Sequence, residues 1–447
     1  MPNPFQKQVF TLSVLVALVL MSIFFTTQAL AIGNSQANTL TRDLEPVVIT
    51  GIQATAFIGA SVDDLFVYTF NGSSLSGQIP IQVDELSAGN YVTVEDGILD
   101  ADDEIVIMAM DLGERKPATT ALTATLPISD TWYQIEVTDS LNPAKKGWAY
   151  LVRSSSLSPS FADDYANYVA GPPPRITASK YDLRYKTGVA DPFFGIDYLA
   201  LNGSGTNILD RTKLRVVASV FGFPFTFTEE SLSNPATTLI KDGPIRVILQ
   251  QTATASSAGQ QQATYKAYGS FVEGIVKVDF SSVGFNPISS ARTSYDLNSA
   301  LANQITFLNA NTPAAVTVDG NPDSVAATPL SKWTQINHNN SGRLVQVGNP
   351  ASAGGTQTNF YRDNSTPESN DTGQPGSYGD AGVLVQGSIN SAFSLRSSLY
   401  VLPYGGGAKV GPTYESYFNS PLLVSTGFQG APPPGTIFLP LILKNSN

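Results

Sequence analysis

The chain has 447 residues, which predicts two or three domains, and it carries a formal net charge of -11. It has no cysteine and a single histidine, which excludes disulfides, cysteine nucleophiles and metal sites built from thiolates or several histidines. The acidic balance argues against nucleic acid as a partner, because phosphates attract clustered Lys and Arg.

Residues 1–31 have the pattern of an export signal. Lys7 precedes an apolar run, 9–25, and Ala29-Leu30-Ala31 then gives the small–x–small pattern that signal peptidase accepts. The alternative is a membrane anchor, because the run is nearly long enough to span a bilayer. The cleavage pattern favours removal, so the chain would meet the membrane only during export. The polar residues 32–44 are predicted to be a disordered lead-in.

Residues 45–153 contain short apolar runs separated by turn clusters. Apolar and polar residues alternate over 133–138, which places the apolar set on one face of a half-buried strand. The continuous apolar runs 65–70 and 105–108 are typical of buried strands. This spacing predicts a small antiparallel β-sandwich of about a hundred residues.

The clearest acidic cluster of this region runs from Asp96 to Glu104. Ca²⁺ prefers several carboxylate and carbonyl oxygens around a tight, glycine-containing turn, and Gly97 lies within the run. The run resembles the second half of a dockerin or EF-hand calcium loop. Val92 and Val94 stand where the first ligands would be, so the full motif is not present. The alternatives are a calcium site of another geometry and a solvated acidic turn. The residues that would bind calcium are Asp96, Asp100, Asp102 and Asp103.

A Ser- and Pro-rich segment, 154–175, is predicted to link this domain to a second β-rich region, 176–428. Residues 214–220, 245–249 and 276–280 have the composition and alternation of strands. We predict one large two-sheet sandwich for this region, and the alternative is two smaller sandwiches. The predicted fold class is therefore all-β, with a small N-terminal and a larger C-terminal antiparallel β-sandwich domain.

Two parts of the second region combine tyrosine with arginine. Aromatic rings can stack on sugars because both surfaces are amphipathic, and residues 181–186 lie in an aromatic-rich stretch. The polar run 361–380 has no apolar period, and loops of about twenty residues are usually functional or disordered. The alternatives are tyrosines that fill sheet surfaces and a mobile surface insertion. The candidate glycan-contacting residues are Tyr181, Arg184, Tyr185, Tyr361 and Arg362.

His338 is a further candidate ligand-binding residue. Histidine is suited to proton transfer near neutral pH, and a histidine near Tyr and Arg is one arrangement that polysaccharide lyases use. Its Asn and Gly neighbours favour the alternative, an exposed histidine in a turn. Glycoside hydrolysis would instead need two carboxylates roughly 5–10 Å apart, a distance that the sequence does not give. The candidates for such a pair are Glu229, Glu230, Glu273 and Glu415.

Residues 429–447 form a Pro-rich spacer followed by an apolar tail. Pro432-Pro433-Pro434 predicts a stiff polyproline segment, and Leu439-Pro440-Leu441 begins the run that ends at Lys444. The tail is similar to the short LPL-aliphatic-Lys tails that close many exported bacterial proteins. That resemblance implies a sorting or surface-retention tag. The alternative is a final strand that completes the last sheet.

Together these features predict a secreted or cell-surface protein with a structural or glycan-binding role. The partners would be polysaccharides or components of the cell envelope, and the one cofactor that the sequence suggests is calcium. The alternative is an extracellular carbohydrate-active enzyme, a polysaccharide lyase or glycoside hydrolase. That alternative rests on analogy between folds, because no catalytic motif stands out in the sequence.

Overall fold

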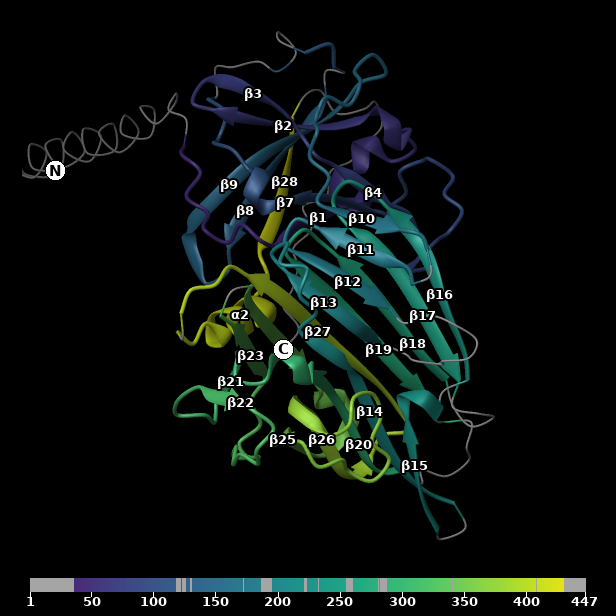
Figure 1. The fold of residues 1–447 in the computed structure, drawn as a ribbon. Helices are drawn as coiled ribbons and strands as arrows, with labels where there is room; N and C mark the ends of the chain where they lie inside the picture. The colour runs from purple at the N-terminus through teal and green to yellow at the C-terminus, as the bar shows by residue number, and fades with distance from the viewer. Residues whose placement is uncertain are drawn as a thin grey trace, which may run out of the picture.

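A computed structural model gives the fold of the chain (Figure 1). It describes residues 36–429, apart from 118–121, 123–125, 129–130, 172, 186–194, 221–222, 232, 255–259, 280, 282–287, 340 and 407. The described part is built almost wholly of antiparallel strands, which confirms the predicted all-β sandwich class. Its helical elements are α2 (Gly411–Asn419) and the 3-10 turns η1 (Gly51–Phe57), η2 (Val62–Asp64), η3 (Ala109–Asp111), η5 (Glu229–Ser231), η7 (Ser299–Leu301) and η8 (Ala351–Ala353).

The small domain is a sandwich of two sheets. One sheet has the order β1 (Pro46–Thr50), β7 (Glu104–Met108) and β4 (Gln82–Asp84). The other has the order β28 (Leu423–Gln429), β8 (Trp132–Asp139), β9 (Asn142–Arg153), β2 (Leu65–Asn71) and β3 (Ser74–Ile79). A short hairpin joins β5 (Leu86–Ser87) to β6 (Asn90–Tyr91). The alternation predicted for 133–138 is present in β8, whose every second side chain is buried in the core between the two sheets.

One strand of the small domain comes from the far end of the chain. β28 lies in the region that the sequence assigns to the large domain, yet it pairs with β8 from Leu423 opposite Thr138 to Gln429 opposite Trp132. The large domain is therefore inserted between β9 and β28 of the small one. Alternation in the sequence identifies a strand but not the sheet that it joins.

The large domain has a central sheet of nine strands with two smaller sheets on one face. The order of the central sheet is β16 (Ser233–Asp242), β17 (Val247–Thr254), β18 (Gln260–Ala267), β19 (Phe271–Asp279), β27 (Ala392–Leu402), β24 (Gly342–Asn349), β23 (Trp333–His338), β21 (Ile305–Asn309) and β22 (Val316–Val318). The first smaller sheet, called the front sheet here, is β10 (Ala166–Val169), β11 (Arg175–Ala178), β12 (Tyr181–Tyr185) and β13 (Ile196–Leu201). The second, called the polar-backed sheet, is β15 (Phe223–Thr228), β14 (Leu209–Val220), β20 (Ile288–Leu297), β26 (Ser377–Ile389) and β25 (Gly354–Asn364).

Alternating side chains give the central sheet two buried faces. On β27, Leu399 and Val401 pack into the core shared with the front and polar-backed sheets. Tyr400 and Leu402 point the other way, into the junction with Val106 and Met108 of β7. Because successive strand side chains point to opposite faces, the central sheet joins both domains into one stack.

The structure also resolves the segment expected to be a linker. Residues 166–169 of that segment form β10, which pairs with β11 at the edge of the front sheet. Within the described residues, no helix is both long and apolar enough to cross a membrane. The predicted signal, 1–31, and the tail beyond Gln429 lie outside the described residues.

Candidate functional site

The outward face of the front sheet carries a cluster of charged and aromatic side chains. β12 turns Tyr181 and Leu183 inward, so Asp182 and Arg184 point outward. The register places Arg184 opposite Arg175 on β11 and opposite Tyr198 on β13, so these three side chains share the outer face. We call Arg175, Asp182, Arg184 and Tyr198 the front cluster.

Both arginines of the front cluster meet the same carboxylate oxygen. Arg184 Nη2 lies 3.1 Å and Arg175 Nη1 3.8 Å from Oδ2 of Asp182. The guanidinium of Arg184 lies over the ring of Tyr198, 3.9 Å from its centre. The hydrogen bond to Asp182 raises the pKa of Arg184, which fixes its positive charge. Two cations thus share one carboxylate oxygen, and the nearby carboxyl of Asp197 also raises the pKa of Arg184.

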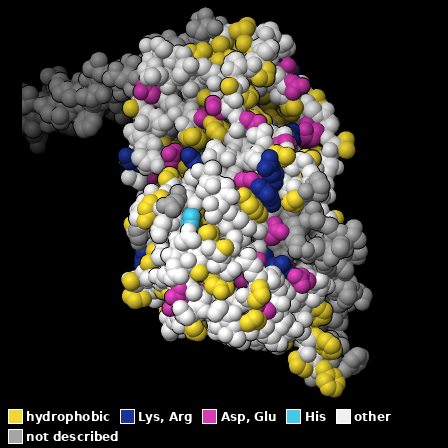
Figure 2. Space-filling view, viewed as in Figure 1, with side chains coloured by type: hydrophobic (Ala, Val, Ile, Leu, Met, Phe, Trp, Pro, Cys, Tyr) yellow, Lys and Arg dark blue, Asp and Glu magenta, His cyan; other side chains and the backbone are white. Residues whose placement is uncertain are grey.

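The front cluster is open to solvent at its arginines. The side chain of Arg175 is 41% exposed and that of Arg184 is 32% exposed. Oδ1 of Asp182 and Nε of Arg184 have no hydrogen-bond partner among the described residues. Figure 2 shows basic and acidic side chains gathered over this part of the molecule, next to largely uncharged surface. An incoming anion could therefore reach the exposed parts of the two arginine side chains, whereas Oδ1 of Asp182 and Nε of Arg184 are buried.

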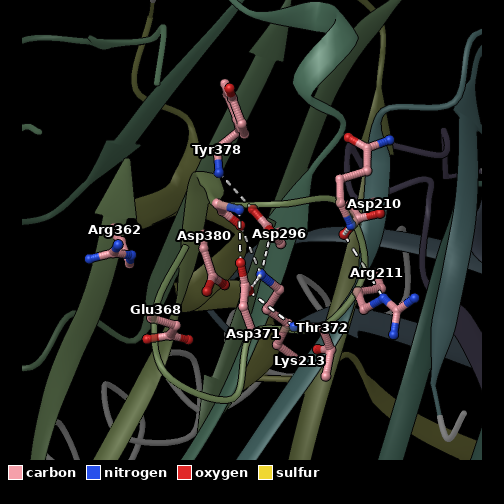
Figure 3. Close-up of polar contacts among 12 residues, drawn as sticks. Asp210, Arg211, Lys213, Asp296, Arg362, Glu368, Asp371, Thr372, Tyr378 and Asp380 are labelled. Atoms are coloured by element: carbon pink, nitrogen blue, oxygen red, sulfur yellow. Dashed lines mark hydrogen bonds and ion pairs between the residues drawn. The ribbon is translucent and has the colours of Figure 1, made fainter. Parts of the chain in front are cut away.

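A second concentration of charge is buried on one face of the polar-backed sheet (Figure 3). The register aligns Arg211 with Asp296, Lys213 with Ser294, and Arg215 with Arg292. All six of these residues are buried. The opposite face of the same strands, including Leu209, Val216 and Ala381, packs into apolar cores.

The loop 365–376 covers this charged face and is bound to it by polar contacts. Lys213 Nζ donates to Oδ1 of Asp371 at 2.9 Å and to the carbonyl of Gly376 at 3.2 Å. Arg292 donates through two nitrogens to the carboxylate of Glu368. Arg215 Nη2 donates to Oγ1 of Thr372 at 2.9 Å. The loop therefore supplies two carboxylates to cations that the sheet itself provides.

Two buried carboxyl groups lie beneath this loop in different surroundings. Asp296 accepts from Lys213 at 2.7 Å and from the backbone N–H of Tyr378 at 2.8 Å. Asp380 has no hydrogen bond on either oxygen among the described residues, and its ion pair with Arg292 is 3.9 Å long. Burial raises the pKa of both groups. The nearby carboxyl of Asp380 raises the pKa of Asp296 further, whereas Lys213 opposes that rise.

The predicted sugar-contacting residues are spread over several surroundings. Tyr181 is buried, and its hydroxyl donates to the carbonyl of Tyr268 at 2.7 Å, so it packs in the core rather than facing a ligand. Arg184 belongs to the front cluster. Tyr185 ends β12, and its side chain lies outside the described parts. Of the three residues on this strand, Arg184 is the one that the structure places in an open cluster.

The predicted residues of the 361–380 run are anchors of the fold. The ring of Tyr361 packs 4.4 Å from that of Phe307 in the large core. Arg362 Nη2 donates to the carbonyl of Thr366 at 2.6 Å, which fixes the first turn of loop 365–376. Residues 361–364 and 377–380 of this run lie in strands β25 and β26, so the irregular part is shorter than the sequence predicts.

His338 is buried, unlike the exposed turn histidine that the sequence favours. It is the last residue of β23, and its Nδ1 lies 2.6 Å from Oγ of Ser341. Burial lowers the pKa of His338, which favours the neutral imidazole. Of the four candidate glutamates, Glu229 and Glu230 lie together and both pair with Arg211. Glu273 pairs with Arg396 on the central sheet, and Glu415 lies in α2.

The acidic run 96–104 forms a turn held by its own carboxylates. Asp103 is buried and accepts from the backbone N–H groups of Leu86 and Asp100, at 2.9 and 2.6 Å. Asp96 accepts from the N–H of Ile98 at 2.8 Å, and Asp102 from that of Gly89 at 3.4 Å. No group of three or more His, Cys, Asp or Glu side chains within the described residues is placed to hold a metal ion. Calcium binding by Asp96, Asp100, Asp102 and Asp103 stays a prediction.

The sequence analysis missed the buried charged face. Its signal is a charge at every second position of a strand, as in Arg211, Lys213 and Arg215, with the uncharged Thr212 and Leu214 between. Such a pattern predicts a polar strand face that is normally solvated. Only the position of loop 365–376 in space shows that this face is enclosed.

No protein-family model matches the sequence, and no curated protein sequence matches it. Among solved structures, the chain is similar to the α-N-acetylgalactosaminidase NagBb from Bifidobacterium bifidum, in complex with GalNAc, with 12% identity and a TM-score of 0.35. The match covers 55% of this chain and 38% of that chain, so the chain spans well under half the length of this neighbour.

Proposed function

We propose that the protein is exported, is held at the cell surface or secreted, and binds an acidic polysaccharide through the front cluster. The single observation that carries the binding role is the pair Arg175 and Arg184, both partly exposed and sharing one carboxylate oxygen of Asp182. An arginine fork matches the geometry of a carboxylate or sulfate group. A sugar carboxylate would therefore find two guanidinium groups in reach.

The aromatic partner supports a sugar rather than a bare anion. Tyr198 lies under Arg184, so an acidic sugar bound at the guanidinium would lie near the edge of a flat ring. The chain as a whole carries a net charge of -11, which repels polyanions from most of the surface. Attraction at the front cluster would therefore give local rather than general binding, and salt would weaken it.

Binding is tested with the exported protein and three polysaccharides: a polyuronate, a sulfated polysaccharide and a neutral glucan. We expect the acidic polymers to bind and the neutral glucan not to bind. The Arg184→Ala variant should bind at least about tenfold more weakly, since a charge-assisted contact contributes about 1.5–3 kcal/mol. Arg153→Ala is the control, because Arg153 is also a partly exposed arginine that pairs with one aspartate, Asp64, but it lies outside the front cluster. Equal binding by the neutral glucan, or full binding by Arg184→Ala, would contradict the proposal.

The same mixtures also test the enzymatic alternative. New reducing ends or unsaturated products would show a hydrolase or lyase in place of a binding protein. Export is tested separately by sequencing the N-terminus of the protein recovered outside cells, which we expect to begin at Ile32. If the tail is a retention tag, deleting 437–444 moves the protein from the cell surface to the medium.

A further inference from the structure

Asp380 is a fully buried carboxyl group without a hydrogen bond among the described residues, and it lies beneath loop 365–376. An isolated buried carboxylate is costly, and a buried carboxyl group in such a place normally takes up a proton. The hydroxyl of Ser294 on the neighbouring strand also lies near Asp380 and lowers its pKa, although the two groups do not reach hydrogen-bond geometry. Asp380 thus differs from the neighbouring carboxylates Asp296, Glu368 and Asp371, each of which has a close cationic partner.

The charged groups facing Asp380 come from each element packed against it. β14 contributes Lys213, and β20 contributes Arg292 and Asp296. β25 contributes Arg362, which lies opposite Asp380 in the strand register. The covering loop contributes Glu368, which already occupies Arg292 with two hydrogen bonds. Lys213 is occupied by Asp296 and Asp371. Lys213 and Arg292 are thus paired with other carboxylates, and Arg362 donates to the carbonyl of Thr366.

We propose that Asp380 holds a proton while loop 365–376 is closed, and that loss of this proton releases the loop. Ionised Asp380 would add a carboxylate beside Asp296 and Glu368, whose ion pairs already engage Lys213 and Arg292. Lifting the loop admits water to the charged face and relieves this repulsion. Gly373 and Gly376, at positive φ of 80° and 88°, form the turn by which the loop returns to the sheet.

The direction of the pH effect follows from the two states of Asp380. In the open state the carboxyl is hydrated and has an ordinary pKa of about 3.9. In the closed state burial raises its pKa. Between these two pKa values the closed state binds the extra proton, so the opening constant rises about tenfold per pH unit. Above the pKa of the closed state the opening constant levels off.

The test is hydrogen exchange of the loop amides in the full exported protein between pH 5 and 9, corrected for the intrinsic dependence of exchange on pH. In the wild type we expect opening to increase with pH by at least about tenfold before it levels off. Asp380→Asn should keep the loop closed over the whole range, because the neutral amide needs no proton. Wild type and Asp380→Asn with the same pH profile would overturn the proposal.

Two further variants separate the effect of the Asp380 proton from the effect of the ion pairs around loop 365–376. Glu368→Gln weakens the hold of Arg292 on the loop, so opening should increase at every pH while the slope remains. Asp296→Asn removes a partner of Lys213, and it too should raise opening at every pH. If Asp296→Asn abolishes the slope and Asp380→Asn preserves it, the proton belongs to Asp296 and the proposal fails.

An infrared measurement on the wild type keeps the proposal testable if a variant does not fold. A neutral carboxyl group gives a carbonyl band that is lost when the group ionises. Glu45 and Asp111 contribute to this band, since burial raises their pKa values to about 7 and about 6. Burial raises the pKa of Asp296 as well, so it also contributes. We therefore expect the part of the band that comes from Asp380 to disappear in step with loop opening. Loop opening without loss of this part would rule out the proton as its cause.

Discussion

Arg246 links the two domains through buried charge. It lies in the large domain just before β17, is fully buried, and reaches Oδ2 of Asp84 at 2.6 Å and the carboxylate of Glu104 in the small domain. Its Nη1 donates to the hydroxyl of Tyr268 at 2.8 Å. The guanidinium thus balances Asp84 and, together with Lys266 at 4.0 Å, Glu104.

We expect Arg246→Met to destabilise the protein by about 3–5 kcal/mol, because removing one partner leaves buried charges uncompensated. Lys241→Met is the matched control, since Lys241 also pairs across the domains, with Glu95, but both side chains are partly exposed. Its loss should cost about 1 kcal/mol or less. Denaturant unfolding measures both variants, and equal losses would show that burial is not what makes Arg246 important.

His338 gives the molecule a second residue-scale dependence on pH. Because burial lowers its pKa, the unfolded chain takes up a proton on His338 at a higher pH than the folded chain does. Stability is therefore lost as pH falls through the unfolded pKa of about 6.5, by at most about 1.4 kcal/mol per pH unit. In His338→Gln the loss between pH 7 and 5 should be smaller, as measured by denaturant unfolding at each pH. A variant as pH-sensitive as the wild type would place the effect on other groups.

At the scale of elements, β28 shows how the small domain depends on the end of the fold. Val424 and Phe428 point to the core of the small sandwich, and the ring of Phe428 lies 5.4 Å from that of Tyr133. Ser425, between them, is exposed. The strand thus covers an edge of β8 that would otherwise present unpaired backbone groups.

We expect Val424→Asp to destabilise the small domain by about 1–3 kcal/mol, because it places a charge against an apolar core. Ser425→Asp on the opposite face should change stability by about 0.5 kcal/mol or less. Limited proteolysis reports the result, since loss of β28 should expose sites in 45–153 before sites in the central sheet. Equal effects of the two substitutions would mean that β28 contributes little to the core.

The sequence identifies individual strands better than it identifies the segments with which they pair. Alternation and apolar runs identified β2, β7 and β8, because the period of side chains along a strand is a local property. The partner of β28 and the burial of His338 depend on contacts between distant segments, which local patterns do not encode. For the same reason Arg184 could be named as a candidate, whereas the enclosure of Asp296 and Asp380 could not.

At the scale of the whole molecule, the two sandwiches are joined over an apolar junction. β7 is buried on both faces: Ile105 and Ile107 pack into the small core, while Val106 and Met108 pack against the central sheet. The small domain also holds the large one by both of its ends, through β9 and β28 (Figure 1). Unfolding either domain would expose the junction of the other.

This coupling predicts a single calorimetric unfolding transition for the wild type, with equal calorimetric and van't Hoff enthalpies. Met108→Asp places a charge in the junction, whereas its neighbours Ile105 and Ile107 continue to fill the small core. We therefore expect the variant to unfold in two transitions, because each domain keeps its own core and loses only the shared one. Met108→Leu conserves volume and apolar character, so it should retain one transition at nearly the wild-type temperature. Two transitions in the wild type would show that the domains are stable independently, and that Arg246 and β7 join them without making them cooperative.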